Sequence, residues 1–211
     1  MTLEEQFKFI EENIPLEKHF HSSRKMRHSF FDSIQIEVQA YMLGFYAADG
    51  NINEKRKTLR IQLAEDDFEI VNLYRDLIAP TARTFRFQEK LKPVGRNGKT
   101  YKCSASYGVD INSTLICQSL VNLGFGYRKT WEEHKLPDIK PELIRHFIRG
   151  YFDGDGSIIG SYVKPDIKYK KNARFRAYWN VVSKTKSLLV EIQQFLERNG
   201  IKSSICFAKR D

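Results

Sequence analysis

An apolar run of helical length, with a glycine inside it, occurs twice in this chain, and each copy ends on Asp-Gly. The first copy is AYMLGFYAADGNI at residues 40–52, and the second is HFIRGYFDGDGSI at residues 146–158. A glycine commonly ends a helix, which explains the last residue of each Asp-Gly pair. An aspartate in the last helical turn faces the negative end of the helix dipole, where like charge costs about 0.3 to 1 kcal/mol. Its presence at both Asp49 and Asp155 therefore indicates a function.

The composition is that of a basic globular protein. The 211 residues include 35 Lys and Arg against 26 Asp and Glu, which gives a formal net charge of +9. Such an excess favours a polyanionic partner, because binding releases counterions. The three cysteines form no CxxC pair, and neither a signal sequence nor an apolar run of membrane-spanning length is present. We therefore expect a soluble, intracellular protein that binds nucleic acid and no membrane.

Residues 38–130 alternate between helical and strand periodicity. In TLRIQLA at 58–64, the apolar side chains share one face, and Arg60 and Gln62 share the other. A helix is expected over 65–80, a strand over 83–88 with Phe85 and Phe87 inward, a strand over 100–109 and a helix over 112–126. The expected order is helix, strand, strand, helix, strand, strand, helix.

Residues 1–37 are expected to form a short helix and a basic arm, which either contacts phosphates or is a solvated linker. After a linker at 131–140, residues 141–211 begin the same series of elements. Arg60 and Gln62 align with Tyr178 and Asn180, so we interpret the chain as an internal duplication. The second copy is expected to lack its last strand and helix. Its first hairpin is longer and contains an insert rich in Lys and Arg.

The two runs resemble the signature of the LAGLIDADG homing endonucleases of the two-motif, single-chain type. The matching segments are MLGFYAADG at 42–50 and IRGYFDGDG at 148–156, and the resemblance covers residues 30–211. It implies an α+β fold of two pseudo-symmetric αββαββα half-domains, the second truncated at its C-terminus, in a monomer. It also implies that the two motif helices pack side by side through small residues, here Gly44, Ala47, Gly150 and Gly154.

The resemblance further implies a metal-dependent active centre where the two motif helices end. Asp49 and Asp155 would be catalytic Mg²⁺ ligands, assisted by the backbone carbonyls of Ala48 and Gly154, and Mn²⁺ would be expected to substitute. Lys184 suits stabilisation of charge near a scissile phosphate. Lys184 aligns with Asp66 in the first copy. An aspartate does not stabilise negative charge, so the two half-sites would be chemically unequal.

DNA would be read by outward side chains of the strands, which can reach base edges in the major groove. The expected readers are Arg60, Gln62, Arg86, Gln88, Lys102, Ser104, Ser106, Tyr178 and Asn180. The expected phosphate contacts are Lys168, Lys170, Lys171, Arg174 and Arg176 in and beside the insert.

The resulting hypothesis is a site-specific, double-strand DNA endonuclease encoded by a mobile intron or by a free-standing selfish gene. No self-splicing blocks flank the two runs, which argues against an intein. One alternative is an RNA-binding maturase that acts on its host intron RNA. Another is a DNA-binding protein that has lost cleavage, although binding alone has no use for two carboxylates that face phosphates.

Overall fold

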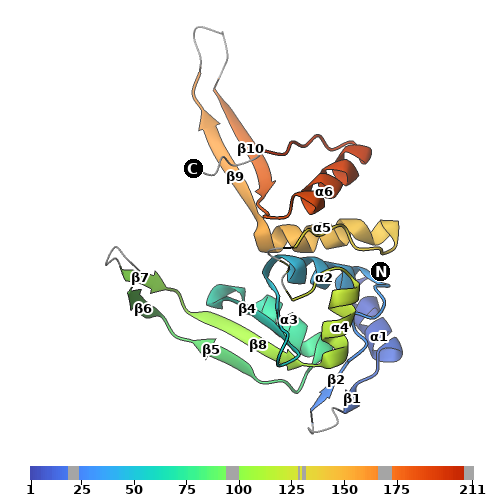
Figure 1. Cartoon of the computed structure of the whole chain (residues 1–211). Coiled ribbons are helices and arrows are strands. Elements are labelled where there is room, and N and C mark those ends of the chain that lie inside the picture. Colours follow the sequence, from blue (N-terminus) through green and yellow to red (C-terminus); the bar gives the residue numbers. More distant parts are fainter. Residues whose placement is uncertain (19–23, 94–99, 128, 130–131, 166–172, 207–211) are drawn as a thin grey trace.

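The computed structural model describes residues 1–18, 24–93, 100–127, 129, 132–165 and 173–206. It is a mixed α+β structure whose sheets are antiparallel. Two helices, α2 (Glu37–Asp49) and α5 (Pro141–Asp155), lie side by side at its centre (Figure 1). A sheet with its helices lies beyond α2, and a long hairpin with one helix lies beyond α5. Within the described ranges, no helix combines the length and the apolar character that a bilayer crossing requires.

The N-terminal segment is part of the core. Helix α1 (Leu3–Asn13) begins with a capping box between Thr2 and Glu5, and strands β1 (Glu17–Lys18) and β2 (Lys25–Met26) pair after it. The guanidinium of Arg27 is buried and donates from Nε to the Ile14 carbonyl and from Nη1 to the Leu77 carbonyl. This arginine therefore ties the segment to the core.

The region after α2 follows the expected order, except that a strand at 90–93 was not expected and the strand expected over 100–109 is divided in two. Its helices and strands are β3 (Asn51–Asn53), β4 (Thr58–Ala64), the 3₁₀ turn η1 (Glu65–Asp67), α3 (Phe68–Ile78), β5 (Thr84–Phe87), β6 (Lys90–Pro93), β7 (Thr100–Cys103), β8 (Ser106–Asn112) and α4 (Thr114–Asn122). One sheet has the order β3-β4-β8-β5, and β6 pairs separately with β7. Leu59, Ile61 and Val109 are fully buried on the face of this sheet that α3 and α4 contact.

The predicted orientation of β5 is wrong. Phe85 pairs with Gly108 and Arg86 with Tyr107, so Phe85 shares the outward face with Arg60, and Arg86 does not. Gly108 makes this possible, because a Cβ there would lie 2.5 Å from the Phe85 ring. Alternation gives the period of a strand but not which face is inward, and a register change of one residue exchanges the faces.

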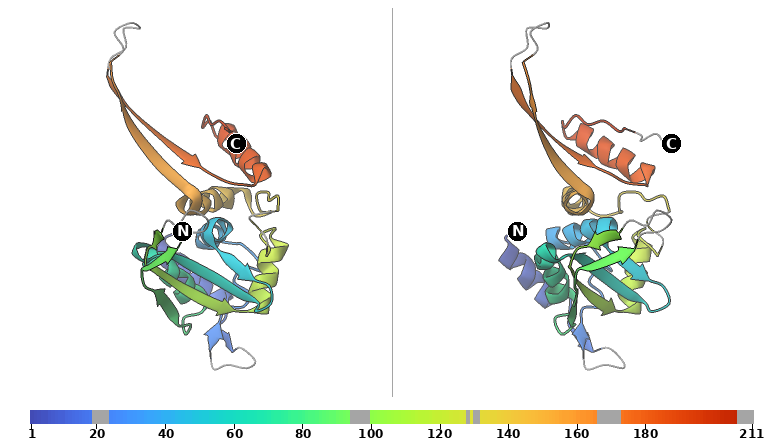
Figure 2. Two further views of the ribbon diagram at one scale, coloured as in Figure 1. Left: turned by 60° about the vertical axis from the view of Figure 1, so that its left-hand side comes forward. Right: turned by 90° about the vertical axis from the view of Figure 1, so that its left-hand side faces the viewer.

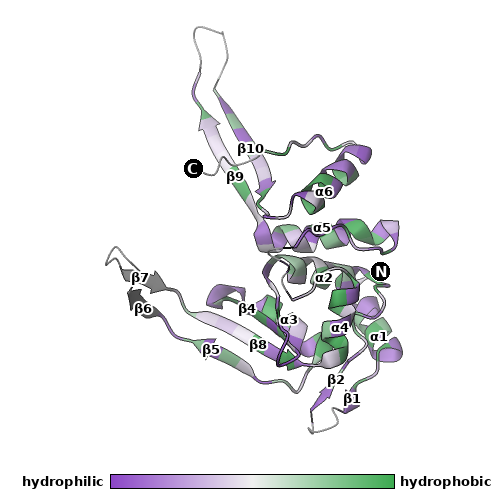
Figure 3. Ribbon diagram, in the orientation of Figure 1, coloured by the Kyte–Doolittle hydropathy of each residue, from purple (hydrophilic) through white to green (hydrophobic). Residues whose placement is uncertain are grey.

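The second region contains α5, β9 (Gly156–Val163), β10 (Arg174–Val181) and α6 (Lys186–Arg198). β9 and β10 form a two-stranded hairpin that extends away from the helices, as both views in Figure 2 show. Hydrophobic and hydrophilic residues alternate along much of β10 (Figure 3). Trp179, aligned with the buried Ile61, keeps 42% of its surface exposed.

The strand expected from residue 201 onward is not formed in residues 201–206, which have no regular secondary structure. A strand is defined by its pairing, and these residues have no strand partner in the described part of the chain. The thiol of Cys117 is buried, whereas Cys206 is exposed. That the two halves are related by a pseudo-two-fold axis stays a prediction.

Glycines allow the backbones of α2 and α5 to touch. A Cβ on Gly44 would lie 1.9 Å from the carbonyl oxygen of Phe147, and one on Gly150 would lie 2.0 Å from that of Tyr41. Gly154 meets Ala48 in the same way, with 2.4 Å to its Cβ. The prediction that small residues lie at this contact is therefore confirmed for these glycines.

Replacing Gly44 or Gly150 with alanine is expected to destabilise the protein by about 2 to 4 kcal/mol, because each methyl group would meet backbone atoms that cannot move aside locally. Gly126→Ala is the matched control, since its Cβ would lie 3.6 Å from the nearest neighbour, the Val121 side chain. Urea unfolding of the three variants measures the difference. Equal midpoints for Gly44→Ala and Gly126→Ala would contradict the close contact.

Candidate functional site

Helices α2 and α5 end next to each other, each on an aspartate. A Cβ on Gly154, the residue before Asp155, would lie 3.2 Å from Oδ2 of Asp49. The Asp49 side chain is exposed and that of Asp155 is half-buried. Desolvation raises the pKa of both carboxyls, and the charge of Asp49 raises the pKa of Asp155 further. The two acids therefore form one electrostatically coupled pair.

A lysine that the sequence did not reveal lies beside this pair. Nζ of Lys129 donates to the carbonyl oxygens of Ala47 at 2.8 Å and of Ala48 at 2.6 Å, in the last turn of α2. Burial lowers the pKa of Lys129 to about 8, although the carboxylates of Asp155 and Asp49 oppose that shift. Nothing in the residues around position 129 distinguishes this lysine from the others, because its role arises only when the chain returns to α2.

The backbone of Lys129 is held by His134. One ring nitrogen of His134 contacts the carbonyl oxygen of Lys129, and the other contacts that of Gly124 at 2.7 Å. The ring is buried and lies against Phe125, with 5.5 Å between the ring centroids. These contacts fix the backbone of Lys129, whereas its ammonium group lies at the end of α2.

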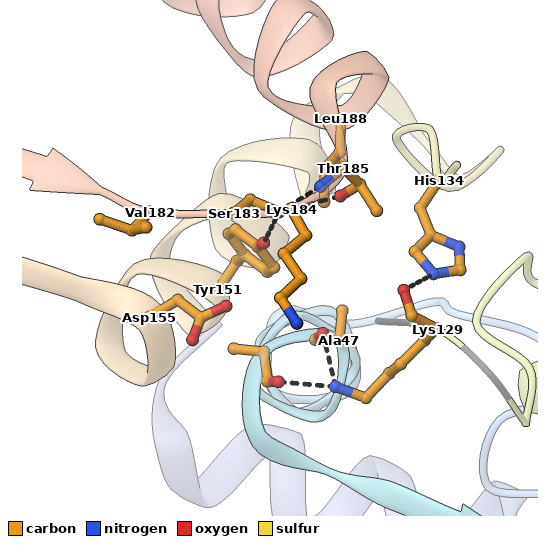
Figure 4. A pocket seen from close by; sticks show the side chains of 11 residues that line it. Ala47, Lys129, His134, Tyr151, Asp155, Val182, Ser183, Lys184, Thr185 and Leu188 are labelled. Carbon is orange, nitrogen blue, oxygen red and sulfur yellow. Dashed lines mark hydrogen bonds between the residues drawn. The ribbon is translucent and has the colours of Figure 1, made fainter. Parts of the chain in front are cut away.

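A pocket of about 270 Å³ opens at this point between the ends of α2 and α5 and the segment after β10. Its lining includes Asp155, Lys129 and Lys184, so the structure brings the predicted Lys184 to the predicted Asp155. Figure 4 shows Lys184 and Lys129 extending from different segments toward the end of α2. Tyr151 donates to Oγ of Ser183 at 2.9 Å, which ties α5 to the segment that carries Lys184.

The first half offers different chemistry at the position equivalent to Lys184. The 3₁₀ turn η1 contains three acids, and Glu65 among them pairs with Arg86 at 2.6 Å. The charge of Asp67 contributes to the raised pKa of Asp49. Asp66 lies in this turn, and its chemical inequality with Lys184 stays a prediction.

The donor set at the carboxylate pair fits a hard divalent cation. Within the described ranges, no cluster of three or more His, Cys, Asp or Glu side chains could hold a metal ion. Mg²⁺ does not require one, since it is usually held by one or two carboxylates together with water and substrate phosphates. The Ala48 carbonyl, predicted as a ligand, accepts a hydrogen bond from Lys129, and a carbonyl oxygen retains a second lone pair.

The outward face of the first sheet carries several of the predicted DNA contacts. Arg60 forms an ion pair with Asp110, and Gln62 donates to Oγ of Ser106 at 2.9 Å. Gln88 and Ser104 are exposed outside the strands. Arg86 is exposed, but its side chain belongs to the other face of the sheet and forms an ion pair with Glu65. Its prediction as an outward reader is therefore corrected. Lys102 lies in β7.

The second hairpin presents the remaining predicted contacts. Arg174, Arg176, Tyr178 and Asn180 share one face of β10, because they are two residues apart. The first three are exposed, and Asn180 accepts a hydrogen bond from Ser157 on β9. Lys168, Lys170 and Lys171 lie outside the described residues.

If this face contacts DNA phosphates, Arg174→Ala and Arg176→Ala should each make the slope of log K against log salt shallower by about 0.9. The control is Lys8→Ala on α1, where Lys8 forms a 3.8 Å ion pair with Glu12 at the N-terminal side of the protein. Binding titrations on double-stranded DNA at several salt concentrations measure the slope. An unchanged slope in both arginine variants would place the face away from DNA.

Comparison with known proteins supports the family on the second half of the chain. Residues 142–207 match the profile of the LAGLIDADG-like domain, a span that contains α5 from its second residue, β9, β10 and α6. A search of curated proteins found no significant match. The matched domain indicates a function of the homing-endonuclease or maturase type. The chain thus contains a LAGLIDADG-like domain at residues 142–207, which supports its assignment to the LAGLIDADG family.

Proposed function

We propose that the protein is a site-specific, divalent-metal-dependent endonuclease that cuts both strands of DNA. The observation that carries this proposal is the pair Asp49 and Asp155, two coupled carboxylates at adjacent helix ends. Each lies where the helix dipole disfavours negative charge, and desolvation disfavours it further. A cation between them would offset both costs, whereas a purely structural helix end gains nothing from them.

Asp49 and Asp155 would hold Mg²⁺, with Mn²⁺ as the expected substitute, together with the backbone carbonyls of Ala48 and Gly154. When bound, the ion supplies activation of water and neutralisation of charge at the phosphate. The ammonium group of Lys129, fixed by two carbonyls, would balance negative charge that develops at the pocket. Lys184 would do so from the other side of the same pocket.

The first sheet and the β9–β10 hairpin diverge from the ends of α2 and α5 (Figure 1). DNA that contacts both would therefore place its backbone at the carboxylate pair. The outward residues of β4 and β8 and the exposed face of β10 would then contact bases and phosphates. Since both helices that carry the acids belong to one chain, we propose that the protein acts as a monomer. Its net charge of +9 supports binding to a polyanion in the cell.

The test is cleavage of a double-stranded DNA library by the purified protein in Mg²⁺, in Mn²⁺ and in EDTA, followed by sequencing of the new ends. We expect double-strand breaks at one recurrent sequence in either metal and none in EDTA. An RNA-binding maturase would instead bind its intron RNA and leave the library intact. Binding to DNA without breaks in any metal would indicate the form that has lost cleavage.

A further inference from the structure

Arg60 on the outward face of the first sheet is held in one orientation by two neighbours. Its Nε donates to Oδ1 of Asp110 at 2.6 Å and its Nη2 to Oδ2 at 2.5 Å, so the contact is bidentate. Asp110 lies directly across from it, because β4 and β8 pair Arg60 with Asp110. The guanidinium carbon also lies 5.2 Å from the centroid of the Phe85 ring.

Phe85 can take this position only because its strand partner is glycine. A Cβ on Gly108 would lie 2.5 Å from the ring of Phe85, so any other residue would displace the aromatic surface on which Arg60 rests. Three strands therefore contribute to one arginine: β4 provides the side chain, β8 the carboxylate and the space, and β5 the ring. A surface arginine that makes only a chance ion pair does not need such an arrangement.

The contacts leave one edge of the guanidinium available. Arginine has five N–H groups, and Asp110 uses one on Nε and one on Nη2. The other three lie on Nη1 and Nη2, and two of them point in parallel from the end of the side chain. The side chain remains 41% exposed, so this end can reach a ligand outside the sheet.

We propose that Arg60, positioned by Asp110 and Phe85, selects guanine at one base pair of the DNA target. This inference rests on the proposed DNA-binding function. Guanine presents two acceptors, O6 and N7, in the major groove, and these match two parallel N–H donors. Adenine presents a donor at the position of O6, which a guanidinium with no acceptor cannot satisfy.

Asp110 is in this account a positioning residue that also makes binding selective. It fixes the direction of the free edge, and its negative charge disfavours approach of a phosphate to Arg60. Without it, the guanidinium could rotate and contact the DNA backbone, which carries no sequence information. The other polar pair on this face, Gln62 and Ser106, lacks both a charge and a fixed fork of donors.

The experiment is selection of bound sites from a randomised double-stranded DNA library in Ca²⁺, performed with the parent and four variants. For the parent we expect one position that is guanine in nearly all selected sites. Arg60→Ala and Arg60→Lys should both lose that preference, because lysine keeps the charge but lacks the fork, and affinity for the parental site should fall roughly tenfold or more. Asp110→Ala should relax the same position while total DNA affinity holds or rises.

Arg75→Ala is the matched control. Arg75 forms a similar bidentate pair with Asp76, at 2.7 and 3.1 Å, but it lies on α3, on the other side of the sheet. This variant should keep the parental preference at every position. Thermal melting of all variants verifies that they are folded.

The outcomes separate this inference from the proposed function. If the parent selects a defined sequence and its guanine positions survive in Arg60→Ala, Arg60→Lys and Asp110→Ala, the inference is wrong and DNA recognition stands. If the parent selects no sequence at all, both the inference and the site-specific DNA function are overturned. Loss of guanine in Arg60→Ala alone, with Asp110→Ala like the parent, removes the role of Asp110.

Discussion

Replacing either Asp49 or Asp155 with asparagine is expected to lower double-strand cleavage by roughly three orders of magnitude. Asparagine keeps the size of the side chain and one oxygen but removes the charge that a divalent cation requires. Because the two acids form one coupled pair, the loss of either one should remove the ion that both hold. Affinity for DNA in Ca²⁺ or without metal should stay the same or increase, since one negative charge near the phosphates is gone.

The same substitutions should not destabilise the metal-free protein. A carboxyl whose pKa is higher in the folded than in the unfolded state stabilises the fold only at low pH, and that contribution is lost as the pH rises through the folded pKa. Partial desolvation raises the pKa of both carboxyls, so at neutral pH their charges oppose folding. The melting temperature of each asparagine variant should therefore equal or exceed that of the parent.

Asp153→Asn is the control for both measurements. Asp153 is exposed on α5, two residues before Asp155, and it accepts a hydrogen bond from Tyr41 at 3.0 Å. This variant should cut DNA at the parental rate. Single-turnover cleavage assays, gel shifts in Ca²⁺ and thermal melting are the measurements. If the Asp49→Asn protein cuts both strands at the parental rate, Asp49 has no role in cleavage and only ends a helix.

The parts of the fold that the sequence predicted are those that depend on local periodicity. Leu59, Ile61 and Leu63 alternate with polar residues, and that pattern gave β4 and its buried face correctly. The glycines and aspartates of α2 and α5 identified the central contact because residues of that kind have no other reason to recur at that spacing. These features are encoded within a few residues of each other.

The features that the sequence did not reveal depend on pairing between distant segments. The alternation in β5 was seen, but its inward face was assigned to Phe85 because aromatic residues are usually buried, and the space over Gly108 reversed it. Asp110 was missed because β8 was expected to end at residue 109. Asp110 is an even number of residues after Ser106, so extending the strand would have placed both side chains on the outward face.

Alignment with the first half does not give burial in the second hairpin, since Trp179 aligns with the buried Ile61 but is exposed. Alternation assigns a side chain to a face, but only a second layer of structure buries that face. Trp179 makes an edge-on contact with Phe152, with 5.6 Å between centroids, and it pairs across the hairpin with Ile158, which is still more exposed. The pattern that describes a strand therefore does not describe what covers it.

The lysine at the carboxylate pair gives the second large effect. Lys129→Met, which keeps the apolar part of the side chain, is expected to lower the cleavage rate by about 100-fold, with little change in DNA affinity. The ammonium group is positioned by the carbonyls of Ala47 and Ala48, so its charge lies at the pocket before any substrate arrives. Lys135→Met is the control, since Lys135 is exposed six residues later. Equal single-turnover rates for Lys129→Met and the parent would assign Lys129 to helix capping alone.

The pH dependence of stability provides an independent test of the same lysine. Burial lowers the pKa of Lys129 from its ordinary 10.5 to about 8, so between these values the unfolded chain binds a proton that the folded protein has released. By linkage, stability then rises with pH across that interval. Other groups titrate there too, but they are shared with Lys129→Met, so the difference in melting temperature between parent and variant isolates the lysine. We expect the melting temperature of the parent to rise relative to that of the variant as the pH increases from about 8 toward 10. A difference that stays constant over that range would mean that Lys129 is not desolvated at the ends of α2 and α5.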